Sequence, residues 1–359
     1  MAADAGRLTA LCRAVLRSAL LFGMVAACGA AALAKGAAGG DTVGAFPYGA
    51  QLAELYHELR LRCGSDTIGS VYVTEERMMR RTIEYDMEKI EQTAAWVNHF
   101  ARQQTAPVYW MALPTAAGIY GETLPEYAPR ANEPAMLQAV AAQLDDSVTA
   151  IEVYSWLYAM REAYICYRTD DRLTAYGSFC AYKTAIRKLG FTGIGYDRYR
   201  ITHLTAEYQG NLAQETGYYR LPADVVDLYT CENGAEYTSI TEYDNSGNAK
   251  QRESLYQTEL LAQEEVLRHS ACDVFASATV PMLQVETSVG NGKHLLLLTD
   301  DNGLGMVPFL MQHYACVTVI NTDLAEAALW EQASAMEPAQ ILIVCGADTI
   351  ANGQWQIKS

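Results

Sequence analysis

The chain has 359 residues, of which 50% are hydrophobic and 19% are charged. This length is ample for a sizeable buried core, and the hydrophobic content excludes an intrinsically disordered chain. The 26 Lys and Arg residues against 42 Asp and Glu residues give a net charge of −16. Such a charge repels phosphate backbones and therefore argues against a nucleic-acid partner.

The N-terminal segment has the pattern of an export signal or a membrane anchor. Basic residues up to Arg17 precede an apolar run over 18–34, and this order is typical of such segments. Three interpretations stay open. Cys28 is the lipidation site of a bacterial lipoprotein, or the run is an uncleaved membrane anchor, or a signal peptidase cleaves after Ala34 and the protein is secreted. Each interpretation places the body of the protein outside the cytoplasm, and the first two tether it to a membrane.

The rest of the chain is expected to form one α/β domain. Residues 35–68 are a linker and lead-in, the domain covers 69–359, and a polar, Tyr-rich insertion with short strands occupies about 193–290. Short apolar runs predict buried strands over 107–114, 148–153, 293–299, 316–320 and 340–344. Apolar residues at helical spacing predict helices over 82–103, 134–144, 174–189, 306–314 and 324–335. This alternation predicts a mostly parallel sheet with helices on both faces.

The cysteines and tyrosines allow more than one interpretation. The nine cysteines form no C-x-x-C pair and no zinc-like cluster with histidine. Seven of them follow the N-terminal segment, mostly in apolar stretches, so buried free thiols are expected while disulfides stay open. Tyrosines gather in 154–167 and 196–229. They suit stacking on sugars, although half-buried packing is the favoured interpretation.

Three stretches of the chain carry the strongest functional signal. They are VYWMALPTAAGIYGETLPEYAP over 108–129, YRTDDRLTAYGSFCAYKTAIRKLG over 167–190 and KHLLLLTDDNGLGMVPFLMQHY over 293–314. Together they resemble the bacterial DHHW protein family, whose members are similar to permuted SGNH hydrolases and to the proteins that O-acetylate alginate and other exported polysaccharides. The resemblance runs from about residue 69 to residue 353. It implies a three-layer SGNH-hydrolase-like sandwich with a β-rich insertion.

The resemblance also assigns catalytic positions. Acyl transfer of this kind needs a nucleophilic Ser, a His that takes its proton and an Asp that orients the His. The family's Asp falls on Asp170, its His on Arg172, its Trp on Leu173 and its Ser on Asp301. Arginine keeps its proton at physiological pH and cannot act as a general base. Attack by an aspartate on an ester carbonyl would give only a labile anhydride.

The family's oxyanion segment is altered as well. Its Gly-Gly-Asn corresponds to Ser277, Ala278 and Thr279, and the loss of one oxyanion donor costs about 10²–10³ in rate. The positions of the base, the nucleophile and the oxyanion segment are all changed, while the surrounding sequence pattern persists. The chain is therefore expected to be a catalytically degenerate member of the family.

The replaced catalytic residues are themselves expected to interact. If the fold is kept, Arg172 should meet Asp301 in an ion pair, with Asp170 as a second partner of the guanidinium. Two alternatives stay open. Asp170, Asp171, Asp300 and Asp301 could bind a divalent cation, or Asp170 and Asp171 could belong to a solvated loop. None of the six histidines maps to the family's base, and a replacement base from elsewhere in the chain remains possible.

These observations lead to one expected function and two alternatives. The chain is expected to be an exported, membrane-tethered, non-catalytic relative of the family that binds a cell-envelope polysaccharide or a membrane O-acyltransferase. The first alternative is an active O-acetyltransferase or esterase with rewired residues, and the second is a structural surface lipoprotein. No cofactor or metal ion is implied.

Overall fold

The structure is a computed structural model that describes residues 49–81, 84–258, 264–275 and 278–353, apart from 327, 328, 330, 331 and 334. The expected export segment with Cys28, the linker up to residue 48, and Ser277 lie outside the described residues. Within the described part, no helix is both long and apolar enough to cross a bilayer.

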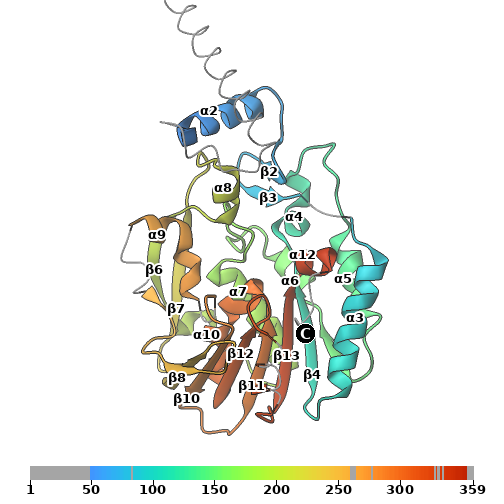
Figure 1. Cartoon of the computed structure of the whole chain (residues 1–359), viewed down its shortest axis with the longest axis vertical. Helices are drawn as coiled ribbons and strands as arrows, with labels where there is room; N and C mark the ends of the chain where they lie inside the picture. The colour runs from blue at the N-terminus through green and yellow to red at the C-terminus, as the bar shows by residue number, and fades with distance from the viewer. Residues whose placement is uncertain are drawn as a thin grey trace, which may run out of the picture.

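An eight-stranded sheet forms the centre of the molecule (Figure 1). Its strand order is β5-β4-β13-β11-β12-β10-β8-β9, and the first five strands are parallel while the last three are antiparallel to their neighbours. All five strands expected from apolar runs are present in the parallel part. The strands are β4 (Val108–Leu113), β5 (Val148–Ile151), β8 (Tyr237–Tyr243), β9 (Ala249–Gln251), β10 (Met282–Thr287), β11 (His294–Thr299), β12 (Cys316–Asn321) and β13 (Gln340–Gly346).

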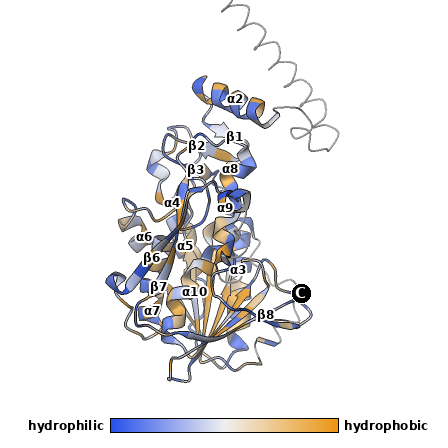
Figure 2. Cartoon of the chain, turned by 90° about the vertical axis from the view of Figure 1, so that its left-hand side faces the viewer, coloured by the Kyte–Doolittle hydropathy of each residue, from blue (hydrophilic) through white to orange (hydrophobic). Residues whose placement is uncertain are grey.

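The central strands are hydrophobic on both sides because helices cover both faces of the sheet. Leu295 and Leu297 of β11 face one core, and Leu296 and Leu298 face the other. Full burial of each such side chain contributes about 1.5–3 kcal/mol, and Figure 2 shows these strands in orange. The first core is shared by α7 (Ala175–Lys188) and α10 (Val307–Leu310), and the second by α3 (Met87–Arg102), α5 (Glu133–Ala141) and α12 (Ala347–Asn352). The expected three-layer α/β sandwich is confirmed.

Several helices begin or end away from their expected bounds. The helix expected from residue 82 begins at Met87, because the side chain of Asp86 caps it by accepting a hydrogen bond from the Glu88 N–H. The helix expected over 306–314 is only the four-residue α10, flanked by the 3₁₀ helices η5 (Asp301–Met306) and η6 (Met311–His313). The helix expected over 324–335 falls on a segment that is described only in part.

The lead-in and the insertion add elements around the sheet. The lead-in contains helix α2 (Gly49–Arg62), which lies with a small sheet at the end of the molecule away from the large sheet (Figure 1). The insertion supplies a two-stranded ribbon, two helices and the three antiparallel strands of the large sheet. The small sheet consists of β1 (Thr67–Ile68), β2 (Val71–Val73) and β3 (Met78–Arg80). The ribbon of the insertion consists of β6 (Tyr199–Tyr208) and β7 (Asp224–Cys231), and its helices are α8 (Asn211–Thr216) and α9 (Glu264–Ser270).

The cysteines of the described part are free thiols, and several of its tyrosines are buried in the core. All seven described cysteines are free, and four of them are buried. Tyr182, Tyr199 and Tyr229 are buried and pack against the ring of Phe309 at centroid distances of 5.2–5.6 Å. Tyr199 and Tyr229 belong to the Tyr-rich segment 196–229, and for these two rings the favoured interpretation, packing rather than stacking on sugars, holds.

Candidate functional site

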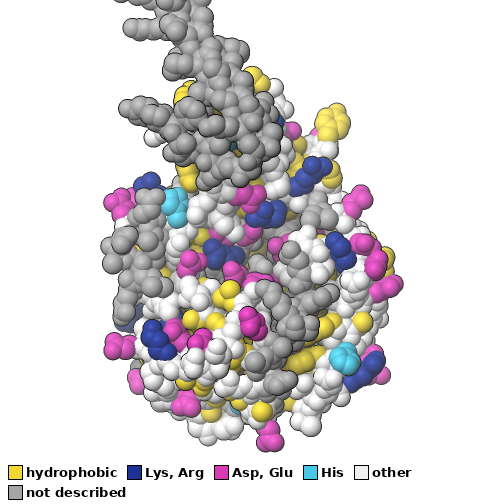
Figure 3. Space-filling model, viewed as in Figure 1, with side chains coloured by type: hydrophobic (Ala, Val, Ile, Leu, Met, Phe, Trp, Pro, Cys, Tyr) yellow, Lys and Arg dark blue, Asp and Glu magenta, His cyan; other side chains and the backbone are white. Residues whose placement is uncertain are grey.

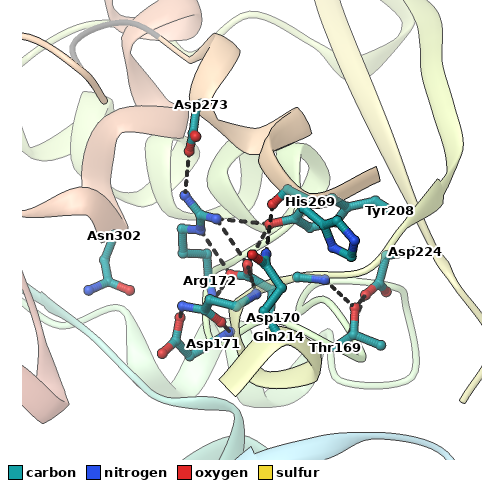
Figure 4. A network of polar contacts seen from close by, with 12 residues as sticks. Thr169, Asp170, Asp171, Arg172, Tyr208, Gln214, Asp224, His269, Asp273 and Asn302 are labelled. Atoms are coloured by element: carbon teal, nitrogen blue, oxygen red, sulfur yellow. Dashed lines mark hydrogen bonds and ion pairs between the residues drawn. The ribbon is translucent and has the colours of Figure 1, made fainter. Parts of the chain in front are cut away.

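The candidate site lies at the edge of the large sheet where its parallel strands end. Ligands of open α/β sheets bind at this carboxyl edge, and the 167–174 loop and parts of the insertion border it here (Figure 4). Together they surround an open cleft with a volume of about 550 Å³. The cleft is lined by Asp171, Arg172, Asn211, Gln214, His269, Ser270, Asp273, Asp300, Asp301, Asn302, Asp323, Asp348 and Thr349. Its walls are therefore polar, and six of the thirteen lining residues are aspartates.

Arg172, at the position of the family's base, is held by the acid two residues before it. Its Nε lies 2.8 Å from Asp170 Oδ1, and its Nη2 lies 2.9 Å from Asp170 Oδ2. The same Nη2 donates to the Tyr208 hydroxyl at 2.8 Å, and Nη1 lies 3.8 Å from Asp273 Oδ1. Figure 4 shows the guanidinium between these groups. All three nitrogens of the guanidinium therefore face an oxygen of the protein itself.

Asp170 is fully buried and ionised. It accepts hydrogen bonds from the Tyr208 hydroxyl at 2.5 Å and from the backbone N–H groups of Arg172 and Asn211 at 2.9 and 3.1 Å. Burial raises the pKa of Asp170, but the charge of Arg172 and these hydrogen bonds outweigh burial and lower the pKa to about 2. The solvated-loop alternative is thus wrong for Asp170, whose exposed fraction is 0%. A Cβ on Gly210 would lie 2.4 Å from Asp170 Cβ, so glycine is required there.

A second buried carboxylate fixes the loop that carries Asp170. Asp224 on β7 accepts hydrogen bonds from the backbone N–H groups of Arg168 and Thr169 at 2.7 and 2.8 Å. It also accepts from the hydroxyl groups of Thr169 and Tyr164. Burial raises the pKa of Asp224, and these donors offset only part of that rise. The insertion therefore positions the segment that holds two of the family-equivalent residues.

Asp301, at the position of the family's nucleophile, is exposed at the start of η5. Its Oδ1 accepts a hydrogen bond from Asn321 Nδ2 at 3.1 Å, and its backbone N–H donates to Asp323 Oδ2 at 3.4 Å. Both Asp301 and Arg172 line the cleft, but no ion pair joins them. The expected Arg172–Asp301 pair is therefore wrong, because Asp170 already engages the guanidinium with both of its oxygens.

Asp300 is buried beside the cleft with donors of its own. The Gly346 N–H and the Thr349 hydroxyl both donate to its Oδ2 at 2.7 Å, and the Asn302 N–H donates to Oδ1 at 3.0 Å. Burial raises the pKa of Asp300 to about 7 in spite of these donors. The cation site considered over the four aspartates is not formed, because Asp170 and Asp300 have separate partners. The described residues contain no group of three or more His, Cys, Asp or Glu suited to a metal ion.

Glu133, at the start of α5, is another carboxyl group at this edge. It is buried, and it accepts hydrogen bonds from the Thr115 N–H at 2.9 Å and from the Thr115 hydroxyl at 2.7 Å. Burial raises the pKa of Glu133 to about 7. Thr115 also caps α4 (Ala116–Ile119) by accepting from the Gly118 N–H. The P-T-A part of the first family-like stretch thus ties the end of β4 to α5.

The two described oxyanion-equivalent residues, Ala278 and Thr279, lie in different surroundings. A cavity of about 20 Å³, room for about one water molecule, is lined in part by Arg172, Leu173, Ala278 and Asp301. The Thr279 hydroxyl instead donates to Gln257 Oε1 at 3.2 Å near the surface. Of the predicted site residues, the structure brings together Asp170, Arg172, Asp301 and Ala278, and it leaves Thr279 outside the cavity.

The sequence predictions missed the cleft residues that the insertion supplies. His269 on α9 lines the cleft, and its Nδ1 lies 3.2 Å from the Gln209 carbonyl oxygen. Asn211 and Gln214 on α8 line it as well. No motif marks these positions, and the only available signal was the polar character of 193–290.

Comparison with known protein families identifies the family of this chain. The model of the DHHW protein family matches residues 61–320, which is more than half of the chain. The chain belongs to the DHHW family. A search of curated proteins by sequence finds no match.

Three solved structures are reported as similar to this DHHW protein, and the first two share its α/β fold. A DHHW family protein from Eubacterium siraeum is 20% identical, with a TM-score of 0.67 over 80% of this chain and 95% of that one. PatB1 from Bacillus cereus is 16% identical, with a TM-score of 0.66 over 80% of this chain and 98% of that one. The O-acetyltransferase domain of Pseudomonas putida AlgJ is 12% identical, with a TM-score of 0.46 over 79% of this chain and 92% of that one.

Proposed function

We propose that this DHHW protein is a non-catalytic member of its family that binds a cell-envelope glycan in the cleft at the carboxyl edge of the sheet. The observation that carries the proposal is the bidentate pair between Arg172 and Asp170. It supplies a permanently charged group where a proton acceptor would be needed. The ordinary base and nucleophile of acyl transfer are both replaced, while the cleft beside them stays open.

The chemistry of the cleft indicates the class of glycan. Carboxylates accept hydrogen bonds from sugar hydroxyls, and the amides of Asn211, Gln214 and Asn302 can both donate and accept. Six of the lining residues are aspartates against the single cation of Arg172, which is already paired. A polyanionic glycan would be repelled by this charge. The proposal therefore specifies a neutral or amino-bearing glycan.

The location of the protein is part of the same proposal. The arginines before the apolar run 18–34 support export, and Cys28 supports a lipid anchor. A chain held at the membrane would meet envelope glycans or a membrane O-acyltransferase. Mass spectrometry of the mature N-terminus tests this part, with a lipidated Cys28 as the expected result and an unprocessed Met1 in a soluble fraction as the contrary one.

One observation favours a second candidate function. His269 lines the same cleft as Asp301, and a histidine is the most frequent general base in enzymes. An esterase or O-acetyltransferase with a rewired base is therefore the alternative, and saturable ester turnover that is lost in His269→Ala would favour it over the first proposal.

A glycan array tests the binding proposal. The full chain in detergent is applied to neutral, amino-bearing and uronic-acid glycans. We expect binding to a neutral or amino-bearing glycan that falls at least tenfold in Asp301→Ala and in Asn302→Ala. The matched control is Glu253→Ala, because Glu253 is exposed and does not line the cleft. Absence of glycan binding, or binding that neither cleft variant weakens, would refute the proposal.

A further inference from the structure

A second cavity lies apart from the cleft and shares no lining residue with it. Its volume is about 570 Å³, within the usual range for small-molecule sites. It lies between the turn before β3, the segment from α4 to the 3₁₀ helix η1 (Gly121–Thr123), and the chain that leads from α6 (Tyr154–Ala159) to the 167–174 loop. Neither the family nor the proposed function assigns a role to it.

The deep part of this cavity contains a buried arginine without an acidic partner. Arg77 is 8% exposed, and its Nη1 has no hydrogen-bond partner. Its guanidinium carbon lies 3.5 Å from the centroid of the Tyr120 ring, and the Tyr120 hydroxyl is also buried without a hydrogen-bond partner. No ion pair joins Arg77 to a carboxylate in the described part of the chain. A buried charge without a counter-charge is destabilising, so an anion is the group that this position lacks.

Two further arginines line the same cavity. The Arg168 guanidinium lies over the Tyr164 ring at 4.8 Å, and that of Arg161 lies over the Tyr158 ring at 4.2 Å. Arg161 also donates to the Tyr158 carbonyl oxygen at 3.1 Å and lies 3.9 Å from the exposed Glu162. Guanidinium groups stacked on aromatic rings keep their edges available for the two oxygens of a carboxylate.

The opening of the cavity has the opposite charge. Four glutamates among its lining residues are exposed, whereas Arg77, Tyr120 and Ile119 are buried. A simple anion would have to pass these carboxylates, but a ligand with an ammonium group at one end would be attracted by them. The four glutamates are Glu75, Glu76, Glu122 and Glu162.

From this arrangement we infer that the cavity binds a short zwitterionic peptide. The carboxylate of the ligand meets Arg77 at the buried end, and its ammonium group faces the glutamates at the opening. Arg168 supplies a second donor for the carboxylate. The inference is independent of the glycan proposal, since it concerns a different cavity.

Thermal denaturation of the full chain with four probes tests the inference. The probes are alanyl-alanine, N-acetyl-alanine, alanine amide and inorganic phosphate. A ligand that binds only the folded state raises Tm with its concentration. We expect alanyl-alanine to raise Tm, N-acetyl-alanine to act more weakly, and alanine amide and phosphate to have no effect.

Two variants assign the effect to the cavity. Arg77→Gln should abolish the response to alanyl-alanine, and it should leave the Tm of the ligand-free protein unchanged or higher, because it removes an uncompensated buried charge. Arg187→Gln is the matched control, since Arg187 is exposed on α7 and lies outside the cavity. The inference is overturned if alanyl-alanine does not raise Tm, if phosphate or alanine amide matches it, or if Arg77→Gln responds like the control. It is also overturned if Arg77→Gln lowers the ligand-free Tm, which would give Arg77 a structural role.

Discussion

At the scale of single residues, one replacement changes what the family-equivalent position can do. A histidine beside a buried aspartate can take up and release a proton near neutral pH. Arg172 cannot, and its planar guanidinium instead satisfies both oxygens of Asp170. The position has thus changed from a proton acceptor to a fixed cation that neutralises a buried charge. The sequence alone identifies Asp170, Arg172 and Asp301 as equivalent to a catalytic set, but it cannot show which aspartate the arginine prefers.

The Arg172–Asp170 pair should be required for stability. Removal of one member of a buried pair leaves the other as an uncompensated charge, which costs about 3–5 kcal/mol. Arg172→Met should therefore lower the free energy of unfolding by that amount at pH 7, as measured by urea denaturation. Arg187→Met on the exposed side of α7 should change it by less than about 0.5 kcal/mol. A loss below 1 kcal/mol in Arg172→Met would show that Asp170 does not depend on its arginine.

Glu133 should make stability depend on pH. Its pKa of about 7 in the folded protein lies above its value of 4.5 in an unfolded chain. Between these values the folded state binds more protons than the unfolded state, so stability falls as pH rises from about 4.5 to 7 and this contribution is constant above 7. Glu133→Gln can keep the contacts with Thr115 without this titration.

The comparison of Glu133→Gln with wild type at two pH values measures this effect. A shift of one pKa unit corresponds to about 1.4 kcal/mol. Between pH 5 and pH 8 the free energy of unfolding of wild type should therefore fall by roughly 2–3 kcal/mol more than that of Glu133→Gln. A residual slope should remain, since burial raises the pKa of Asp300 in the same direction. In Glu253→Gln the free energy of unfolding should depend on pH as it does in wild type. The same dependence in Glu133→Gln would contradict the assignment of this titration to Glu133.

At the scale of elements, the insertion holds the 167–174 loop in place. Asp224 on β7 accepts four hydrogen bonds from residues 164–169, which lie some sixty positions earlier in the chain. Sequence patterns could not predict this contact, because an aspartate in a polar strand has no distinctive spacing. They did predict the five parallel strands, whose long apolar runs reflect burial on both faces. The strands β1, β2 and β3 were missed because segments of two or three residues carry no periodicity.

Asp224→Asn tests the link between insertion and loop. The amide would place an NH₂ group opposite at least one N–H or O–H donor, and each buried group left unpaired costs about 1–3 kcal/mol. We expect a loss of about 2–4 kcal/mol and faster amide hydrogen exchange in residues 166–174. Asp227→Asn on the same strand is the control, because among the described residues the Asp227 carboxylate hydrogen-bonds to the exposed His203. Unchanged exchange in Asp224→Asn would mean that the loop is held by other contacts.

At the scale of the whole molecule, the family fold persists around an altered site. On the face shown in Figure 3, acidic side chains are interspersed with basic ones, as a chain with 42 acidic and 26 basic residues would suggest. The sheet and both covering layers were predictable, because apolar periodicity is a property of the whole core. The shape of the cleft was not predictable, since it depends on how the insertion folds back over the carboxyl edge.

The central claim is that this cleft does not perform acyl transfer. Its most direct test is the turnover of 4-nitrophenyl acetate by the purified full chain, compared with Asp301→Ala, His269→Ala and buffer alone. We predict that wild type and both variants release 4-nitrophenol at the same rate per mole of protein, with no saturable turnover above buffer. Saturable turnover that either variant abolishes would contradict the claim and would establish an enzyme with a rewired site.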